Sequence, residues 1–307
     1  MSEIEPMNDL TNYRCGTVAL LGRPNVGKST LMNRIIGVKV AIVTPKPQTT
    51  RHRILGIHTS DSCQIIFIDT PGIHRGSKQL NRNMVRIAYA AAEEADVLAI
   101  MQDVSAPLDR ATRALIERFA DGRLQQPRLH VLNKVDQVAK QALLPRLAEM
   151  QRLDPGAVAY IPVSARKGVQ VDALVGEVAL HLPQRPAAYE ADWYTDQSQR
   201  QLAAEYVREQ VFLAMQQEIP FQTAVEIESF CEDENGVAIE AAILVGSERH
   251  KPMLIGKGGE RMKKIGTTAR KGLIALFGCA VDLRLWVRVQ PDWFDNPGRL
   301  QDLGLGS

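Results

Sequence analysis

Cysteine, long apolar runs and repeats are scarce or missing in this chain of 307 residues, and each shortage excludes a class of protein. No uninterrupted apolar run approaches the ~20 residues that cross a bilayer. The acidic stretch Met1–Leu10 lacks an apolar core, so no secretory signal is predicted. The cysteines form no C-x-x-C pair, which argues against a zinc site or a secreted disulfide framework and favours a reducing cytosol. We therefore expect a soluble cytoplasmic protein, with four scattered cysteines: Cys15, Cys63, Cys231 and Cys279.

Aromatic residues make up only 5% of the chain, but hydrophobic residues reach 45% and charged residues 23%. The last two fractions are near the average for globular proteins, which excludes disorder as the dominant state. The net charge of +2 is unevenly distributed. Residues 246–290 contain ten Lys or Arg and three Asp or Glu, so this segment alone carries 10 − 3 = +7. A basic segment can be only a solvated surface, so the charge alone does not identify a ligand.

From Thr17 to Pro183, short apolar runs alternate with longer stretches of helical period. This alternation predicts an α/β domain, in which a mostly parallel sheet has helices on both faces. Leu55–Thr59 is expected to add an antiparallel strand at one edge. Ligands of such sheets bind beyond the carboxyl ends of the strands. The other predicted strands are Thr17–Leu21, Gln64–Asp69, Val97–Met101, Arg128–Leu132 and Ala159–Val163, and the predicted helices are Ser29–Ile36, Arg82–Ala95, Asp109–Ala120, Gln141–Gln151 and Val171–Leu180.

A domain linker is predicted where two prolines fall within Leu182–Pro186 and polar residues follow. Beyond it, the expected order of elements is α-β-β-α-α-β, a small α+β domain that begins with a helix at Gln199–Glu218. Its strands are expected at Ala224–Phe230, Val237–Leu244 and Ala280–Val289, with a turn at Glu232–Gly236. We therefore predict an N-terminal extension (1–12), the α/β domain (13–183), the linker (184–200), the α+β domain (201–290) and a C-terminal tail (291–307).

Gly22–Ser29 matches the phosphate-binding pattern G-x-x-x-x-G-K-[ST] and lies between a predicted strand and a predicted helix. Glycines let the backbone curl so that N–H groups face phosphate oxygens, and the helix N-terminus adds positive potential. Lys28 can then reach the β- and γ-phosphates of a nucleotide, and the Ser29 hydroxyl can hold Mg²⁺. The alternative is an ordinary glycine-rich turn, which the strand–loop–helix context disfavours.

Asp69-Thr-Pro-Gly72 stands at the end of the next buried strand and fits the same phosphate site. Its carboxylate can bind Mg²⁺ through water, and the Gly72 N–H can sense a γ-phosphate.

Two further motifs at strand ends indicate that the base is guanine. In Asn133-Lys-Val-Asp136, the Asp136 carboxylate can accept hydrogen bonds from the ring N–H and exocyclic amine of guanine, which adenine cannot supply. Asn133 is expected to brace this loop and Lys134 to cover the base plane. In Ser164-Ala165, the Ala165 amide is expected to donate to guanine O6. Each motif is short, but four in this order at strand ends are specific.

With these four motifs, the first 183 residues resemble the translation-factor-related GTPases, and specifically the Era family. The resemblance implies a switch I segment at Pro47–Arg53 and a switch II segment from Asp69 through the Gly72–Ser77 loop. It also implies that Thr50 caps Mg²⁺ when GTP is bound, with Thr49 as the second candidate. Without the flanking motifs, both threonines would be interpreted as part of a polar surface loop.

Ile73 marks a departure from Ras-like enzymes, which place a water-orienting glutamine directly after this motif. An apolar side chain cannot orient the attacking water by hydrogen bonding. Backbone, another side chain, a bound ion or a partner must then do so, and we expect slow intrinsic hydrolysis. Asn25 resembles the residue that holds K⁺ in potassium-stimulated relatives, although it could also merely turn the loop.

The resemblance thus implies overlapping sets of site residues. The catalytic residues are Lys28, Thr50, Asp69, Gly72 and Asn25, and Mg²⁺ is held by Ser29, Thr50 and Asp69. The residues expected to bind GTP or GDP are Gly22, Arg23, Pro24, Asn25, Val26, Gly27, Lys28, Ser29, Thr30, Asp69, Thr70, Pro71, Gly72, Asn133, Lys134, Asp136, Ser164 and Ala165.

A second glycine motif, G-x-x-G at Gly256–Gly259, lies in the basic C-terminal segment between two predicted helices. Glycines allow close approach to a nucleic-acid backbone, and lysine meets phosphate. An isolated G-x-x-G is usually a turn, but the order of elements resembles the type II KH fold, which binds single-stranded RNA. The resemblance implies RNA contacts from Gly256, Lys257, Gly258, Gly259, Arg261, Lys263 and Lys264.

A GTPase with Gln48-Thr-Thr-Arg51 joined to a C-terminal KH module resembles the Era family of bacterial ribosome-assembly GTPases over essentially the whole chain. The resemblance implies binding near the 3′ end of 16S rRNA during maturation of the small (30S) ribosomal subunit. It also implies peripheral association with the inner membrane, for which the sequence shows no anchor. We expect a monomer.

Two other functions are compatible with parts of this pattern. The protein could be an RNA-binding chaperone in which GTP is only a structural ligand, and the dependence of RNA affinity on the nucleotide would separate this from a switch. It could also be a relative that acts in tRNA modification. The absence of a cysteine-bearing C-terminus and the presence of Gly256–Gly259 count against the latter.

Overall fold

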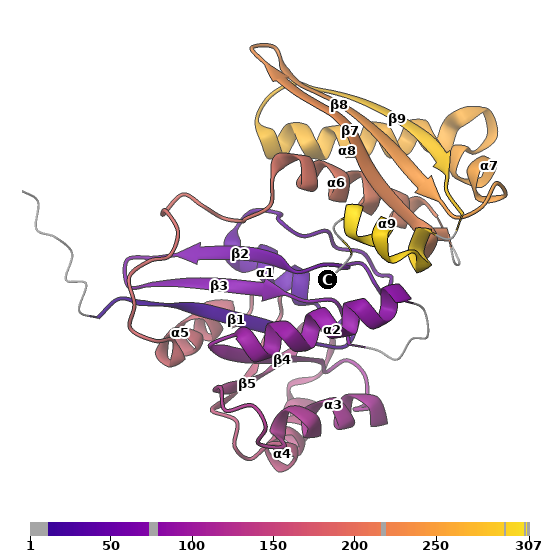
Figure 1. Ribbon diagram of the computed structural model, residues 1–307. Helices are drawn as coiled ribbons and strands as arrows, with labels where there is room; N and C mark the ends of the chain where they lie inside the picture. The colour runs from indigo at the N-terminus through magenta and orange to yellow at the C-terminus, as the bar shows by residue number, and fades with distance from the viewer. Residues whose placement is uncertain (1–11, 74–78, 216–218, 292, 304, 306–307) are drawn as a thin grey trace, which may run out of the picture. The chain divides into compact units, whose positions relative to one another are not determined.

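The computed structural model describes residues 12–73, 79–215, 219–291, 293–303 and 305 (Figure 1). The chain divides into two compact units. The first unit contains the residues up to 38 together with 53–70 and 88–196. The second contains residues 39–52, 71–87 and 197–307, so two segments from the N-terminal half pack with the C-terminal part. The predicted extension at 1–12 lies outside the described residues except for its last position.

A six-stranded sheet in the order β2-β3-β1-β4-β5-β6 forms the centre of the first unit. All neighbouring strands are parallel except β2, which runs antiparallel to β3 at the edge, as predicted. Every residue of β3 is buried, as expected of a strand covered on both faces. The strands are β1 (Arg14–Gly22), β2 (Ile54–Thr59), β3 (Cys63–Asp69), β4 (Val97–Asp103), β5 (Arg128–Asn133) and β6 (Ala159–Pro162).

Helices cover both faces of this sheet, which confirms the predicted α/β architecture (Figure 1). α1 packs on β1, β2 and β3 and against α5, whereas Ala91 of α2 packs with Ile66 and Ile68 of β3. The predicted helix at Asp109–Ala120 begins one residue later, because the Asp109 carboxylate accepts from the Thr112 N–H as an N-cap. The helices are α1 (Lys28–Ile36), α2 (Gln79–Glu94), α3 (Arg110–Ala120), α4 (Leu143–Leu153) and α5 (Val171–His181), with short 3₁₀ helices η1 (Val135–Gln137) and η2 (Lys140–Ala142).

The second unit has the predicted order α-β-β-α-α-β around a three-stranded sheet, β7-β8-β9. β7 and β8 form an antiparallel hairpin, and β9 runs parallel to β8. The hairpin turn is tighter than predicted, because Asp233 accepts from the N–H groups of Asn235 and Gly236 and pairing continues to that turn. The elements are α6 (Gln199–Ala214), η3 (Ile219–Gln222), β7 (Thr223–Asp233), β8 (Gly236–Val245), α7 (His250–Ile255), η4 (Lys257–Gly259), α8 (Glu260–Phe277), β9 (Val281–Val289), η5 (Trp293–Asp295) and α9 (Pro297–Asp302).

α6 begins and ends for identifiable reasons. Ser198 and Gln201 form a reciprocal capping box at its start. The helix was expected to continue to Glu218, but it ends at Ala214, because Met215 is extended (φ −102°, ψ 157°). The Lys46 ammonium contacts the carbonyl oxygens of Phe212 and Met215, so a cation from a distant segment occupies the end of this helix.

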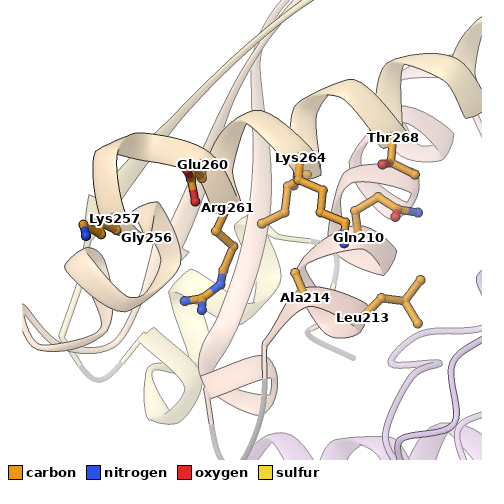
Figure 2. A pocket seen from close by; sticks show the side chains of 10 residues that line it. Gln210, Leu213, Ala214, Gly256, Lys257, Glu260, Arg261, Lys264 and Thr268 are labelled. Carbon is orange, nitrogen blue, oxygen red and sulfur yellow. The ribbon is translucent and has the colours of Figure 1, made fainter.

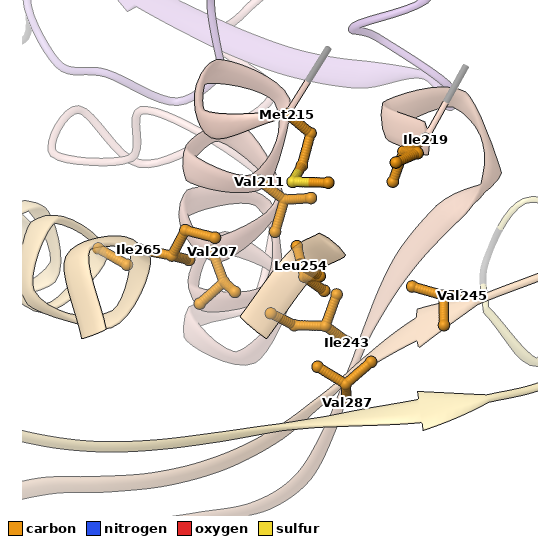
Figure 3. Packing of buried hydrophobic residues seen from close by; sticks show 10 residues of the cluster. Val207, Val211, Met215, Ile219, Ile243, Val245, Leu254, Ile265 and Val287 are labelled. Atoms are coloured by element: carbon orange, nitrogen blue, oxygen red, sulfur yellow. The ribbon is translucent and has the colours of Figure 1, made fainter. Parts of the chain in front are cut away.

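The core of the second unit joins three helices to the sheet (Figure 3). Val207 and Val211 of α6 face Leu254 of α7 and Ile265 of α8, and aliphatic residues of β8 and β9 complete the cluster. Alternation along β9 explains why one face of the sheet is available for this packing: Val281 and Val287 are buried, whereas the residues next to them in the chain include exposed Asp282 and Arg288. Among the described residues, no helix is long and apolar enough to span a membrane.

Residues 39–52 pack with the C-terminal part of the second unit through buried polar contacts. The Arg51 side chain is only 1% exposed and donates to the carbonyl oxygens of Thr223, Pro220 and Phe221 at 2.7, 3.0 and 3.2 Å. Glu209 of α6 pairs with Lys39 at 2.5 Å and accepts from the Val43 N–H at 3.0 Å. This segment therefore belongs structurally with α6, although it precedes β2 in the chain.

Residues from the predicted C-terminal tail also take part in the second unit. Trp293 is buried in a cluster with Leu80 and Met84 of α2 and Leu300 of α9. Asn296 caps α9 by accepting from the Arg299 N–H at 3.1 Å.

Candidate nucleotide and RNA sites

The loop from Gly22 to Gly27 joins β1 to α1 and has a backbone that requires glycine at both ends. At Gly22 (φ +148°) a Cβ would lie 2.5 Å from the carbonyl oxygen of Met101, and at Gly27 (φ +101°) 2.2 Å from Asn133 Nδ2. Asn25 adopts a positive φ of 62°, a conformation that asparagine tolerates better than most residues. The loop therefore has the tightly curled backbone that the phosphate-binding pattern predicts.

Lys28 begins α1 and is 6% exposed. Its ammonium donates to the carbonyl oxygens of Gly22 and Arg23 at 3.3 and 3.1 Å, so the side chain folds back over its own loop. Burial lowers the pKa of Lys28 to about 8, and the nearby Asp69 carboxylate opposes this shift. A phosphate on the loop would supply the negative charge that favours the protonated lysine.

Ser29 and Asp69 lie together, as a shared metal site requires. The Ser29 hydroxyl donates to Asp69 Oδ2 at 2.6 Å, and Asp69 is fully buried at the end of β3. Thr70 fixes the following turn by donating to the Leu20 carbonyl oxygen at 2.7 Å. A hydroxyl and a carboxylate are hard oxygen donors of the kind that Mg²⁺ prefers, so this pair fits that ion.

Asn133 links two of the predicted motifs to the phosphate-binding loop. Its side-chain amide donates to the Val26 carbonyl oxygen at 2.7 Å, and its Oδ1 accepts from the Ala165 N–H at 3.0 Å. The Ala165 amide, expected to meet guanine O6, thus donates to Asn133 in this structure. A single side chain holds the three loops in register.

The other residues predicted to recognise the base are also brought together. Asp136 Oδ1 accepts from the Ser164 hydroxyl at 2.6 Å, which ties η1 to the loop after β6. Lys134 has a positive φ of 69° and its ammonium lies 2.5 Å from Asp103 Oδ2 at the end of β4. Burial alone would raise the pKa of Asp103, but hydrogen bonds from Lys134 and Ser105 lower it below the usual range.

Two residues of this site were missed by the sequence analysis. Asp103 holds the Lys134 ammonium, and Arg34 of α1 donates to the carbonyl oxygens of Ala165 and Arg166 at 3.2 and 2.6 Å. Neither belongs to a motif. An acidic residue at the carboxyl end of a parallel strand was the available signal for Asp103, whereas nothing in the sequence distinguishes Arg34 from other helix arginines.

The residues predicted for the two switches are divided between the compact units: Arg53, Asp69 and Thr70 belong to the first, whereas 47–52 and 71–73 belong to the second. Thr50 is buried there, and Pro71 and Gly72 are grouped with it. The Thr49 hydroxyl contacts that of Thr44 at 2.7 Å and donates to the Lys46 carbonyl oxygen at 2.8 Å. Of the switch II loop expected at Gly72–Ser77, residues 74–77 lie outside the described residues.

The glycine loop of the C-terminal unit is a kinked, exposed turn between α7 and α8. Gly256, Gly258 and Gly259 have positive φ angles of 76°, 60° and 81°. A Cβ at Gly256 would lie 2.9 Å from Arg261 Cβ, whereas Gly258 and Gly259 face open space. Open space beside a glycine turn gives a nucleic-acid backbone room to approach closely.

The cations of this basic segment differ in whether a carboxylate pairs with them. Arg284 pairs with Glu240 at 3.5 Å, and Arg288 pairs with Glu226 at 3.1 Å, on the outer face of the small sheet. Around the glycine loop, the cations form no ion pair with any residue that the structure describes: Lys257, Arg261, Lys263 and Lys264. Positive charge that no carboxylate neutralises is therefore available to an anionic ligand beside the glycine loop.

Comparisons with known proteins agree with this arrangement. A family model described as 50S ribosome-binding GTPase matches residues 17–134, and one described as KH domain matches residues 218–294. The chain is 43% identical to GTPase Era of Pseudomonas fluorescens over 302 residues, 98% of this chain and 99% of the relative. The chain belongs to the GTPase Era family.

Crystal structures of Era have the same fold as this chain. A tyrosine-to-alanine variant of Aquifex aeolicus Era bound to GDP·AlF4⁻ matches with a TM-score of 0.92 and 37% identity, over 96% of this chain and 100% of that chain. Era in complex with MgGDPNP and nucleotides 1506–1542 of 16S ribosomal RNA matches with the same score, identity and coverage. The predicted GTPase activity and the KH domain are confirmed for this Era-family protein, whereas the domain boundaries and the roles of single residues stay predictions.

Proposed function

We propose that this protein is a GTP-driven switch that binds the 3′ region of 16S rRNA and assists maturation of the small ribosomal subunit. The observation that carries the proposal is the exposed Gly256–Gly259 loop with its unpaired cations, in a chain whose other unit brings together the residues predicted to bind a guanine nucleotide. The relative bound to a 16S rRNA segment supports this choice of RNA. The name of the matching GTPase model refers to the 50S subunit, but a bound 16S segment is the more direct indication.

For hydrolysis of GTP to GDP and phosphate, we assign Lys28 to the β- and γ-phosphates and the Gly72 N–H to the γ-phosphate. Ser29 and Asp69 would hold Mg²⁺, with Thr50 joining them in the GTP state. The ion supplies charge neutralisation between the β- and γ-phosphates. The buried Lys28 ammonium would exchange its two carbonyl partners for phosphate oxygens, which are stronger acceptors.

The attacking water needs a partner other than Ile73. We assign Asn25 to a K⁺ that would add positive charge beside the phosphates, because it resembles the residue that holds K⁺ in potassium-stimulated relatives. We therefore expect slow GTP hydrolysis in the absence of a further partner, because Ile73 cannot orient the attacking water.

We further propose a monomer that resides in the cytoplasm and associates peripherally with the inner membrane. The Era family resemblance supports these assignments. The proposed boundaries remain 13–183 for the GTPase domain, 184–200 for the linker and 201–290 for the KH domain.

The RNA-binding assignment is tested by replacing Lys257 and Gly258 together with aspartate. Negative charge and bulk against the phosphate backbone should weaken binding to an oligonucleotide of the 16S 3′ region. Each lost phosphate contact on a single strand should reduce the salt slope of log affinity by about 0.7. Both residues are exposed, so folding and isolated GTP hydrolysis should change little. Unchanged affinity and salt slope would mean that the loop is only a structural turn.

The switch assignment is tested with the same oligonucleotide in the GDP and GTP-analogue states. If the protein is a switch, its RNA affinity should differ between the two states. GTP turnover should be lost in Lys28→Ala. Equal RNA affinity in every nucleotide state would favour the RNA chaperone with GTP as a structural ligand.

A further inference from the structure

A cavity of about 560 Å³ opens between the second half of α6 and the first half of α8 (Figure 2). The two helices approach closely at Gly272, where a Cβ would lie 2.8 Å from the Tyr206 ring. Towards the glycine loop the helices stay in contact through Val207, Val211 and Ile265, and the cavity lies beside this contact. Its volume lies in the range of about 300–1,000 Å³ that is typical of small-molecule sites.

The walls of the cavity combine cations with an apolar floor (Figure 2). Lys257, Arg261 and Lys264 carry positive charge against a single acidic residue, Glu260. Leu213 is 51% exposed, an unusual state for a leucine at the rim of a charged cavity. Ala214 and Ile265 continue the apolar surface, and polar groups come from Gln210 and Thr268.

This cavity lies on a different side of α8 from the surface that meets β9. Gly266 faces β9, since a Cβ there would lie 3.5 Å from Leu285. At 100° per residue, Arg261 and Thr268 point well away from the direction of Gly266 and Met262. The glycine loop precedes the first turn of α8, so it borders both the cavity side and the β9 side of the helix. Gly256 and Lys257 themselves line the cavity. A strand that crosses the loop can therefore reach the α6 side.

We propose that this cavity binds one nucleotide of the single-stranded RNA that crosses the glycine loop, so that α6 contributes to RNA recognition. The inference rests on the proposed RNA-binding function. The cations would meet the phosphate, and Leu213 and Ala214 would cover one face of the base, with the buried Ile265 behind them. Gln210 offers both a donor and an acceptor to a base edge, which allows base preference. An acidic peptide would use the same cations, but the half-exposed leucine beside them fits the flat apolar face of a base.

The test uses the full chain and the 16S 3′-region oligonucleotide, with paired variants. Leu213→Asp places a carboxylate at the cavity, and Ile274→Asp places one on α8 at another exposed apolar residue that does not line it. Leu213→Asp should weaken RNA binding about tenfold, and Ile274→Asp should leave it near wild type. A second pair of variants compares Lys264, which lines the cavity, with Lys271, which does not. Lys264→Glu should bind RNA more weakly than Lys271→Glu, and its salt slope of log affinity should be smaller by about 0.7.

Shortening the RNA one nucleotide at a time provides a readout that misfolding would not produce. Removing the nucleotide that occupies the cavity should weaken binding to wild type but not to Leu213→Asp. Equal effects of Leu213→Asp and Ile274→Asp, or equal sensitivity of both proteins to shortening, would overturn the inference. If those variants behave like wild type while the Lys257/Gly258 double variant loses RNA, only the cavity assignment fails. If all of them bind like wild type, the proposed RNA function fails too.

Discussion

Single side chains hold the loops of the predicted guanine site in place. Asn133 spans the phosphate-binding loop and the Ala165 turn with one amide group, so both its donor and its acceptor are used. Asp136 is held by Ser164, and Lys134 by Asp103. Because these contacts pre-order the loops, the nucleotide does not have to supply that order on binding.

Replacing Asp136 with asparagine should shift the preference of the protein from guanine to xanthine nucleotides. A neutral amide cannot accept both guanine donors, but it can donate to the additional carbonyl oxygen of xanthine. Affinities for GDP and XDP, measured with fluorescent analogues, check this. GDP affinity equal to that of wild type would show that Asp136 does not read the base.

If Lys28 binds phosphate as predicted, nucleotide binding should depend on pH above neutrality. Its pKa of about 8 should rise when phosphates bind, so binding above about pH 8 should take up a proton. Affinity for Mg·GDP should therefore fall as pH rises, and calorimetry in buffers of different ionisation enthalpy should show more proton uptake at about pH 8.5 than at about pH 7. Uptake that is the same at both values would contradict the assignment.

The same lysine has a defined effect on stability. Its folded pKa lies below the ordinary lysine value of about 10.4, so the folded protein binds fewer protons than the unfolded chain between these values. Its contribution to the free energy of unfolding should therefore become more favourable as pH rises from about 8 to about 10.

At the scale of elements, glycines inside helices differ in their expected effect on stability between the two units. Gly272 in α8 faces Tyr206 of α6, and this close approach sets where the two helices meet. Gly176 in α5 has nothing within 4 Å of the position where a Cβ would stand. The first glycine is required by packing, whereas the second only lowers helix propensity.

Gly272→Ala should destabilise the second unit by up to about 2 kcal/mol, although alanine is the better helix former. The clash with a buried aromatic ring costs about 1–3 kcal/mol, which offsets or exceeds the ~1 kcal/mol gained in propensity. Gly176→Ala is the matched control and should stabilise α5 by up to about 1 kcal/mol. Native-state hydrogen exchange of α5 and α8 peptides measures both; a stabilised α8 in Gly272→Ala would refute the packing argument.

At the scale of the whole molecule, neither compact unit is formed by one continuous stretch of the chain. Residues 39–52 are contiguous with the nucleotide-binding motifs, yet their polar side chains are satisfied by the C-terminal part of the chain. Arg208 of α6 adds a further contact, since its guanidinium donates to the Thr49 carbonyl oxygen at 2.5 Å. The conformation of this switch segment is therefore linked to α6.

Ending the chain at Asp196 should leave nucleotide binding largely intact but expose residues 39–52 to protease. The phosphate loop, Asn133–Asp136 and Ser164–Ala165 all lie in the first unit, whereas Lys39 loses the Glu209 carboxylate and Arg51 loses its carbonyl partners. Trypsin should then cut after Lys39 and Arg51 much faster than in the full chain. Cleavage after exposed Lys140 is the internal control and should not change. Equal cleavage at all three positions would show that α6 does not protect the segment.

The sequence by itself determined the strand–helix alternation, the four nucleotide motifs and the glycine loop between two helices. These features depend on spacing within short stretches, where periodicity and chain geometry fix the local structure. Only the tertiary structure decided that Asp103 holds Lys134, that Arg51 is buried by residues 220–223, and that α6 and α8 separate into a cavity. Each of these depends on residues far apart in the chain, and their distance is set by how whole elements pack rather than by any local pattern.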